Sequence, residues 1–150
     1  MKTSENNLVR KLCDIEELKA NKAKYGLLVD GLVPDADEDK IDRLVDLFTE
    51  DATFDFGGRF GVFGGVEQIR KFYGETLPSQ RSWIWHSFHN PLIEVTGDRA
   101  TGNWTISAMA VSKGQESMPP QIITGRYEDE YIRIDGCWRQ CRLKFINESR

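Results

Sequence analysis

At residues 83–91 the chain reads Trp83-Ile84-Trp85-His86-Ser87-Phe88-His89-Asn90-Pro91. This stretch holds both histidines of the 150-residue chain. It also begins a half of the chain in which apolar and polar residues alternate, which predicts strands at 83–95, 99–112, 121–134 and 137–146. Turn pairs between these strands, such as Asp135-Gly136, indicate antiparallel hairpins. We therefore expect a long antiparallel meander in the C-terminal half.

The N-terminal half has helical periodicity instead. Apolar residues recur at intervals of three and four from Asp14, which predicts a first helix that ends near Gly31, after a flexible lead-in at 1–13. A second helix is expected at 41–48, then a short glycine-flanked hairpin, and a third helix from 66 that Pro78 stops. Three helices followed by a meander predict an α+β fold, with the helices on one face of a curved sheet and one domain over 14–150.

Composition excludes several classes of protein. The net charge is −4 and no basic cluster occurs, so we expect no nucleic-acid partner. No apolar run is long enough for a membrane span, and the polar stretch 1–11 does not resemble a signal peptide. The three cysteines, an odd and sparse set, do not indicate a disulfide framework. Together these features predict a cytoplasmic protein.

One strand could form the wall of a pocket. Its predicted inner face carries several small side chains: Ala100, Gly102, Trp104, Ile106, Ala108 and Ala110. Small residues on a curved sheet leave room for a flat apolar ligand, but helix side chains could equally fill that room. If a pocket exists, we expect the residues that contact its ligand to include Phe54, Trp85, His89, Trp104, Ile106, Ala108 and Tyr127.

The candidate proton-transfer residues are His86 and Asp30. A histidine takes and returns a proton near neutral pH, and an acid that contacts it can hold its ring. Asp30 shares a helix face with small residues, which favours a position beside open space, although a solvated helix end is the alternative. His86 and His89 are three residues apart and point to opposite faces of a regular strand, so only one is expected to face the pocket. Because no acidic cluster accompanies them, we expect no metal site and no cofactor.

Several segments resemble the SnoaL-like branch of the nuclear transport factor 2-like superfamily. The end of the first helix, residues 24–31, is similar to that family, as is the glycine-led third helix at 63–72. The strongest similarity covers 86–95 and the turn after it at 97–101. Residues 125–129 and 135–139 resemble the last hairpin of the family.

The resemblance implies a cone-shaped α+β barrel with a deep apolar cavity. This branch includes scytalone dehydratase, bile-acid 7α-dehydratase and hexachlorocyclohexane dehydrochlorinase, which use a histidine and an aspartate at positions that match His86 and Asp30. A tyrosine that matches Tyr25 belongs to the site in two of them, and a histidine that matches His89 belongs to it in one. From its own helical position, Tyr25 could equally be a core aromatic residue.

Three functions remain open. The first is a cofactor-free lyase or isomerase that acts on a polycyclic or otherwise apolar substrate, such as a steroid or polyketide. In it, His86 is the base, Asp30 orients its ring and Tyr25 donates a hydrogen bond. The second is a non-catalytic binding module, and the third is the small subunit of a ring-hydroxylating dioxygenase. We also expect a homo-oligomer, a trimer rather than a dimer, because the outer face of the sheet mixes apolar and polar residues.

Overall fold

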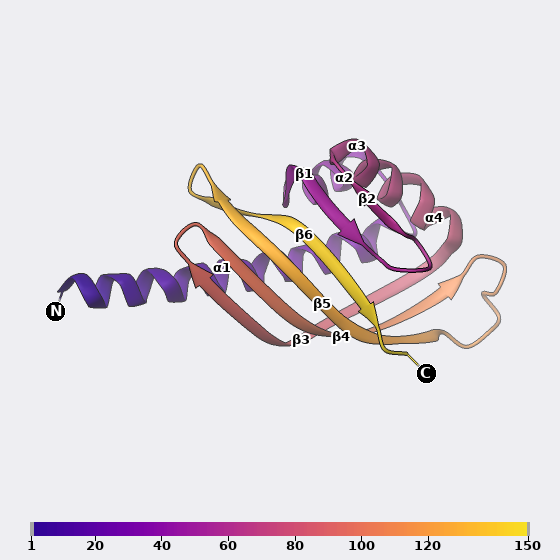
Figure 1. The fold of residues 1–150 in the computed structure, drawn as a ribbon. Coiled ribbons are helices and arrows are strands. Elements are labelled where there is room, and N and C mark those ends of the chain that lie inside the picture. The colour runs from indigo at the N-terminus through magenta and orange to yellow at the C-terminus, as the bar shows by residue number, and fades with distance from the viewer. Residues whose placement is uncertain (1, 150) are drawn as a thin grey trace.

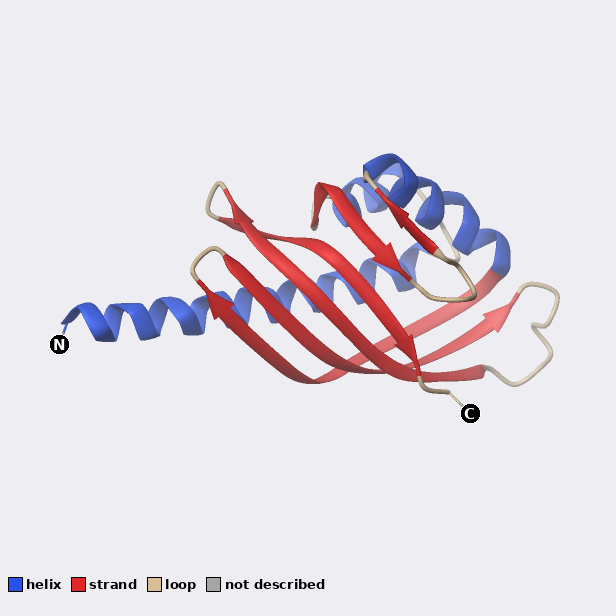
Figure 2. Cartoon of the chain, in the orientation of Figure 1, coloured by secondary structure: helices blue, strands red, loops and turns tan. Residues whose placement is uncertain are grey.

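The computed structural model describes residues 2–149. Its centre is one six-stranded sheet with strand order β2-β1-β6-β5-β4-β3. The strands are β1 (Phe48–Asp55), β2 (Val62–Gly64), β3 (Arg81–Thr96), β4 (Arg99–Ser112), β5 (Gln121–Ile134) and β6 (Cys137–Asn147). The pair β1–β6 is parallel and the other neighbours are antiparallel, so the sheet is mixed. It is curved and not closed (Figures 1 and 2), which confirms the expected α+β fold.

Within residues 2–149, three helical segments accompany the sheet: α1 (Lys2–Leu32), α2 (Glu38–Val45) and a continuous run made of α3 (Val66–Lys71), η1 (Phe72–Thr76) and α4 (Leu77–Gln80). Helix α1 crosses one face of the sheet and packs chiefly on β3, while its N-terminal part projects beyond the sheet (Figure 1). The predicted start of this helix at Asp14 is wrong, because the helix already begins at Lys2. In the described part of the chain none of the helices is both long and apolar enough to cross a membrane.

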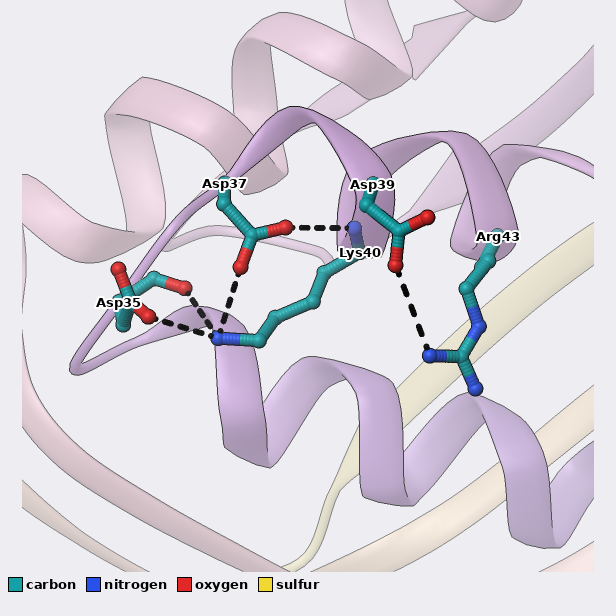
Figure 3. Close-up of polar contacts among 5 residues, drawn as sticks. All are labelled: Asp35, Asp37, Asp39, Lys40 and Arg43. Atoms are coloured by element: carbon teal, nitrogen blue, oxygen red, sulfur yellow. Dashed lines mark hydrogen bonds and ion pairs between the residues drawn. The ribbon is translucent and has the colours of Figure 1, made fainter.

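Helix α2 begins with an acidic cap. The carboxylate of Asp37 accepts a hydrogen bond from the backbone N–H of Lys40 at 2.8 Å, which satisfies an otherwise unpaired amide of the first turn. Lys40 Nζ also contacts the carboxylates of Asp35 and Asp37, both at 3.1 Å, and Arg43 lies near Asp39 (Figure 3). The contacts of Lys40 therefore join the acidic turn to the first turn of α2. The helix ends at Val45, so the prediction that it reaches Phe48 is wrong, and Phe48 instead begins β1.

The third helical segment continues past the proline predicted to stop it. Residues Phe72–Thr76 form a wider π-helical turn, and the N–H of Leu77 bonds back to the carbonyl of Phe72. Pro78 then occupies the first turn of α4, where a missing N–H is tolerated. The π turn buries two consecutive side chains, Phe72 and Tyr73. Such turns are frequent at functional sites.

Candidate active site

A cavity of about 670 Å³ lies between α1, the segment from η1 to α4, and the inner face of the sheet. Its volume is typical of a pocket for a small organic molecule. Most of its wall is apolar: Val29, Phe56, Phe60, Phe72, Leu77, Ile84, Ile106, Ala108, Ile123 and Phe145. The small side chains expected on β4 alternate inward as predicted and are buried from Ala100 to Ala110. The cavity shows that the helices leave part of that room open.

His86 lies on the cavity wall, and Asp30 lies behind it. Asp30 Oδ1 is 2.6 Å from Nδ1 of the His86 ring, and Asp30 Oδ2 accepts a hydrogen bond from the backbone N–H of His86 at 3.1 Å. The side chain of Asp30 is 19% exposed and that of His86 is 7% exposed, so the pair is largely shielded from solvent. This contact between α1 and β3 is the one expected from the sequence. An ionised Asp30 makes Nδ1 the protonated ring nitrogen, which leaves Nε2 free to accept a proton.

Tyr25 contributes a buried hydroxyl to the same cavity. Its Oη lies 2.8 Å from the hydroxyl of Tyr73, and Tyr127 lies beside it with ring centroids 6.4 Å apart. Burial raises the pKa of all three tyrosines well above the ordinary value, so each hydroxyl keeps its proton and can donate it in a hydrogen bond. Tyr73 was not predicted as a site residue, and it lies in the π-helical turn η1, which the sequence does not predict.

Beneath these tyrosines lies a buried ion pair that the sequence analysis missed. Lys22 Nζ is 2.7 Å from Asp129 Oδ2, and neither side chain is exposed. Lys22 Nζ also lies 4.0 Å from the centre of the Tyr127 ring, a cation–π contact. Burial lowers the pKa of Lys22, and the Asp129 carboxylate opposes that shift. The available signal was the apolar stripe of α1, in which Lys22 occupies the position between Leu18 and Tyr25.

The residues predicted to contact a ligand divide into two groups. Ile106, Ala108 and Tyr127 line the cavity. Four others do not line it: His89, Trp85, Trp104 and Phe54.

Each of these four has a different position. His89 lies on the opposite face of β3, where its Nε2 is 3.3 Å from Ser107 Oγ, and Trp85 is exposed on that same outer face. Trp104 is buried on the inner face, beside Gly102. Phe54 stacks on Phe63 within the core, with ring centroids 5.4 Å apart. Of the two histidines, His86 therefore faces the cavity and His89 does not.

Among the described residues no group of three or more histidine, cysteine, aspartate or glutamate side chains could hold a metal ion. The groups that can donate or accept a proton beside the apolar walls include the Asp30–His86 pair and the tyrosine hydroxyls. A pair of this kind can remove a proton from a carbon acid and return it nearby.

Comparison with known families supports the fold. The family model described as the SnoaL-like domain matches residues 10–144. Among curated proteins, none matches the sequence significantly.

Solved structures with this fold are numerous, and three serve as examples. A proposed scytalone dehydratase from Novosphingobium aromaticivorans DSM 12444 has a TM-score of 0.78 and 20% identity, over 93% of this chain and 87% of that chain. A hexachlorocyclohexane dehydrochlorinase from Novosphingobium barchaimii LL02 has a TM-score of 0.79 and 19% identity, over 94% and 90%. A proposed aromatic ring hydroxylase from Novosphingobium aromaticivorans DSM has a TM-score of 0.77 and 25% identity, over 93% and 92%.

Proposed function

This chain belongs to the SnoaL-like domain family, and we propose that it is a cofactor-free lyase or isomerase that moves a proton on an apolar small molecule. The observation that carries the proposal is the Asp30–His86 contact of 2.6 Å at the wall of an apolar cavity. A general base needs a proton-accepting atom that a substrate can reach, and a partner that holds the ring in one tautomer.

In this proposal His86 Nε2 removes a proton next to a substrate carbonyl. Asp30 keeps the proton of the ring on Nδ1 and stabilises the imidazolium that forms. The positive charge develops in a partly buried setting, where a carboxylate at hydrogen-bond distance has a larger effect than it would in water. General-base help of this kind contributes roughly 10²–10⁴-fold to the rate.

Tyr25 is the proposed hydrogen-bond donor to the carbonyl or leaving oxygen. Its hydroxyl is buried and its pKa is raised by burial, so it stays protonated while negative charge develops on the substrate. Either hydroxyl can donate in the bond between Tyr25 and Tyr73, and in this proposal Tyr73 donates to Tyr25, which leaves the proton of Tyr25 for the substrate. Proton return from the imidazolium to another carbon gives an isomerisation, and proton loss with departure of a neighbouring group gives an elimination.

The walls favour a flat, apolar substrate, such as a steroid or a polyketide. Several aromatic rings meet at the cavity, and the rings of Phe56 and Phe72 stack with centroids 5.3 Å apart. Two proteins with the same fold are named a dehydratase and a dehydrochlorinase, which are elimination enzymes by name, and this supports a lyase. The cytoplasmic location expected from the sequence stays a prediction.

Deuterium exchange tests the proposal without knowledge of the natural substrate. In D₂O, the wild-type protein is expected to exchange the α-protons of 2-tetralone, a bicyclic ketone, faster than buffer does, and to do so equally well after exhaustive chelation. His86→Ala should abolish the enzymatic rate, because no other described side chain offers a ring nitrogen to the cavity. The matched control, His89→Ala, removes the histidine of the outer face and should leave the rate unchanged.

The result that overturns the proposal is exchange that persists in His86→Ala or disappears in His89→Ala. Melting temperatures of both variants distinguish lost chemistry from lost folding. Binding of the ketone with no exchange in the wild type would favour the binding module.

One observation supports the alternative of a dioxygenase subunit, namely the structural likeness to a proposed aromatic ring hydroxylase. It predicts a stable complex with a large partner chain and no exchange by the isolated protein.

A further inference from the structure

The end of the cavity away from the tyrosines has a polar rim. The residues come from the loop after β1, the start of β3, the start of β5, the end of β6 and the segment after it: Arg59, Arg81, Gln121, Asn147 and Ser149. Proton transfer at His86 uses none of these groups. Two of the five are arginines, so this end of the cavity is positively charged.

Arg81 faces the cavity because of a β-bulge. Arg81 pairs with Ser112 and Trp83 pairs with Val111, so one extra residue lies on β3 between these two pairs. In a regular strand, residues 81 and 83 would share a face, and Arg81 would lie on the outer face with Trp83. The bulge turns Arg81 to the inner face, which it shares with Ile84 and His86, and only 2% of the residue stays exposed. Bulges often redirect a side chain next to a functional site.

The positive charge of Arg81 has no counter-ion in the described chain. Its Nη1 donates to Ser112 Oγ and to Gln121 Oε1, both at 2.8 Å, and both acceptors are neutral. No described carboxylate lies within ion-pair distance of Arg81, whereas buried Lys22 is paired with Asp129. Arg59, exposed on its loop, adds a second positive charge at the same rim. Burial and then the charge of Arg59 lower the pKa of Arg81.

We propose that Arg81, assisted by Arg59, binds the carboxylate of an apolar substrate while the reactive carbon of that substrate lies at His86. The inference deepens the proposed function and rests on it, since it names the substrate class for the same cavity. A guanidinium presents parallel N–H donors that match the two oxygens of a carboxylate, and Nε and Nη2 of Arg81 have no partner among the described residues. An incoming carboxylate would supply the missing negative charge.

The separation of the two groups sets the length of the substrate. The partners of Arg81 and His86 on β4, Ser112 and Ala108, are four residues apart because of the bulge, which corresponds to roughly 13 Å between backbone positions at about 3.3 Å per residue. Both side chains extend from these positions into the cavity, so the gap that a substrate spans is shorter than the backbone separation. The cavity therefore suits an elongated acid with about two or three fused rings.

The test compares one acid with its neutral amide. The full chain is titrated, by ligand fluorescence, with anthracene-2-carboxylate and with anthracene-2-carboxamide. The wild type is expected to bind the carboxylate about 10-fold more tightly, because charge-assisted hydrogen bonds are stronger than neutral ones. In Arg81→Gln the two affinities should agree within about twofold, through weaker binding of the carboxylate alone. Arg81→Lys should keep part of the preference, since it retains the charge but not the planar donors.

Because Arg81 is buried, its variants are checked by melting temperature, and Arg59→Gln is an exposed companion expected to weaken carboxylate binding about threefold. If Arg81→Gln does not fold, the other two variants decide, and an unchanged preference in both overturns the proposal. Equal binding of acid and amide by the wild type, no binding of either, or an equal loss of both in Arg81→Gln also overturns it.

His86→Ala separates this proposal from the catalytic one. It should keep the preference for the carboxylate although it exchanges no protons. The wild type could prefer the carboxylate through Arg81 and yet exchange no protons of 2-tetralone. That result would support the anion site and contradict the catalytic proposal. Proton exchange without a preference for the carboxylate would support the catalytic proposal and contradict the anion site.

Discussion

Asp30 holds both the backbone and the ring of His86. One carboxylate oxygen accepts from the backbone N–H of His86 and the other contacts the ring nitrogen Nδ1. A carboxylate near the C-terminal end of a helix is unfavourable with respect to the helix dipole, so a good hydrogen-bond geometry has to compensate. The two bonds to one residue supply that compensation. They also fix the ring, so that Asp30 acts through His86 rather than on a substrate.

Replacement of Asp30 by asparagine is expected to put the proton on the wrong nitrogen. The amide N–H of the asparagine would donate to Nδ1 of His86, which leaves the ring proton on Nε2, where the substrate proton has to be accepted. We expect Asp30→Asn to lower the exchange rate by roughly 10²–10⁴-fold. The rate of deuterium exchange measures the loss, and ¹⁵N chemical shifts of the imidazole report the tautomer. A rate within about threefold of the wild type, with the ring still protonated on Nδ1, would contradict this role.

Part of the site could be predicted from single residues. His86 and Asp30 are recognisable by residue type, and Ile106 and Ala108 follow from strict alternation on β4. Arg81 could not be found in this way, since one extra residue in β3 reverses the face on which it lies. Trp85 is a counter-example: alternation alone puts it on the face opposite His86, and the aromatic composition of the stretch misled the prediction.

At the scale of elements, the site depends on how closely α1 approaches β3. A Cβ atom at Gly26 would lie 2.9 Å from Cε2 of Phe88 and 3.8 Å from Cβ of His86. The Phe88 ring in turn stacks on the His86 ring, with centroids 5.8 Å apart. The glycine therefore lets the helix come close enough for Asp30 to reach its partner.

Two glycines of α1 give a matched pair of substitutions. Gly31→Ala meets only Lys40, with Cδ at 4.0 Å, so it should raise the free energy of unfolding by about 0.5–1 kcal/mol through helix propensity. Gly26→Ala has the same gain but must displace Phe88, and overpacking typically costs about 1–3 kcal/mol. We therefore expect Gly26→Ala, unlike Gly31→Ala, to lower the free energy of unfolding measured in urea. Gly26→Ala should also lower the rate of deuterium exchange. Higher stability and an unchanged rate in this variant would show that the close approach is not required.

Strand limits were easier to predict than helix limits. β4 and β5 occupy the predicted ranges 99–112 and 121–134, because alternating residues are bounded there by turn residues. The start of α1 was missed because residues 4–12 are exposed, and a helix that projects away from the sheet has no buried stripe to reveal it. The end of the third helical segment was missed because the π turn accommodates Pro78.

At the scale of the whole molecule, the outer face of the sheet is the feature that the fold of one chain leaves uncovered. Trp85 pairs with Met109, and Met109 pairs with Ile122, so an apolar row crosses three strands. Trp85 is 45% exposed and Ile122 is 71% exposed. The sequence already indicated a half-apolar outer face, although the cross-strand row became visible only with the register. A contiguous apolar patch of this kind is typical of a subunit interface.

We expect this row to be buried between copies of the chain, in a homo-oligomer and preferably a trimer. Sedimentation at micromolar concentration should give a species of about three times the 17.2 kDa chain mass. Trp85→Lys places a charge in the row and should shift the population to the monomer without lowering activity per folded chain, because the side chain lies on the face opposite the cavity. Leu27→Lys is the matched control, since Leu27 is 74% exposed on α1, away from the row. A wild-type species near 17.2 kDa would exclude the oligomer, and dissociation caused by Leu27→Lys instead would move the interface from the sheet to the helix.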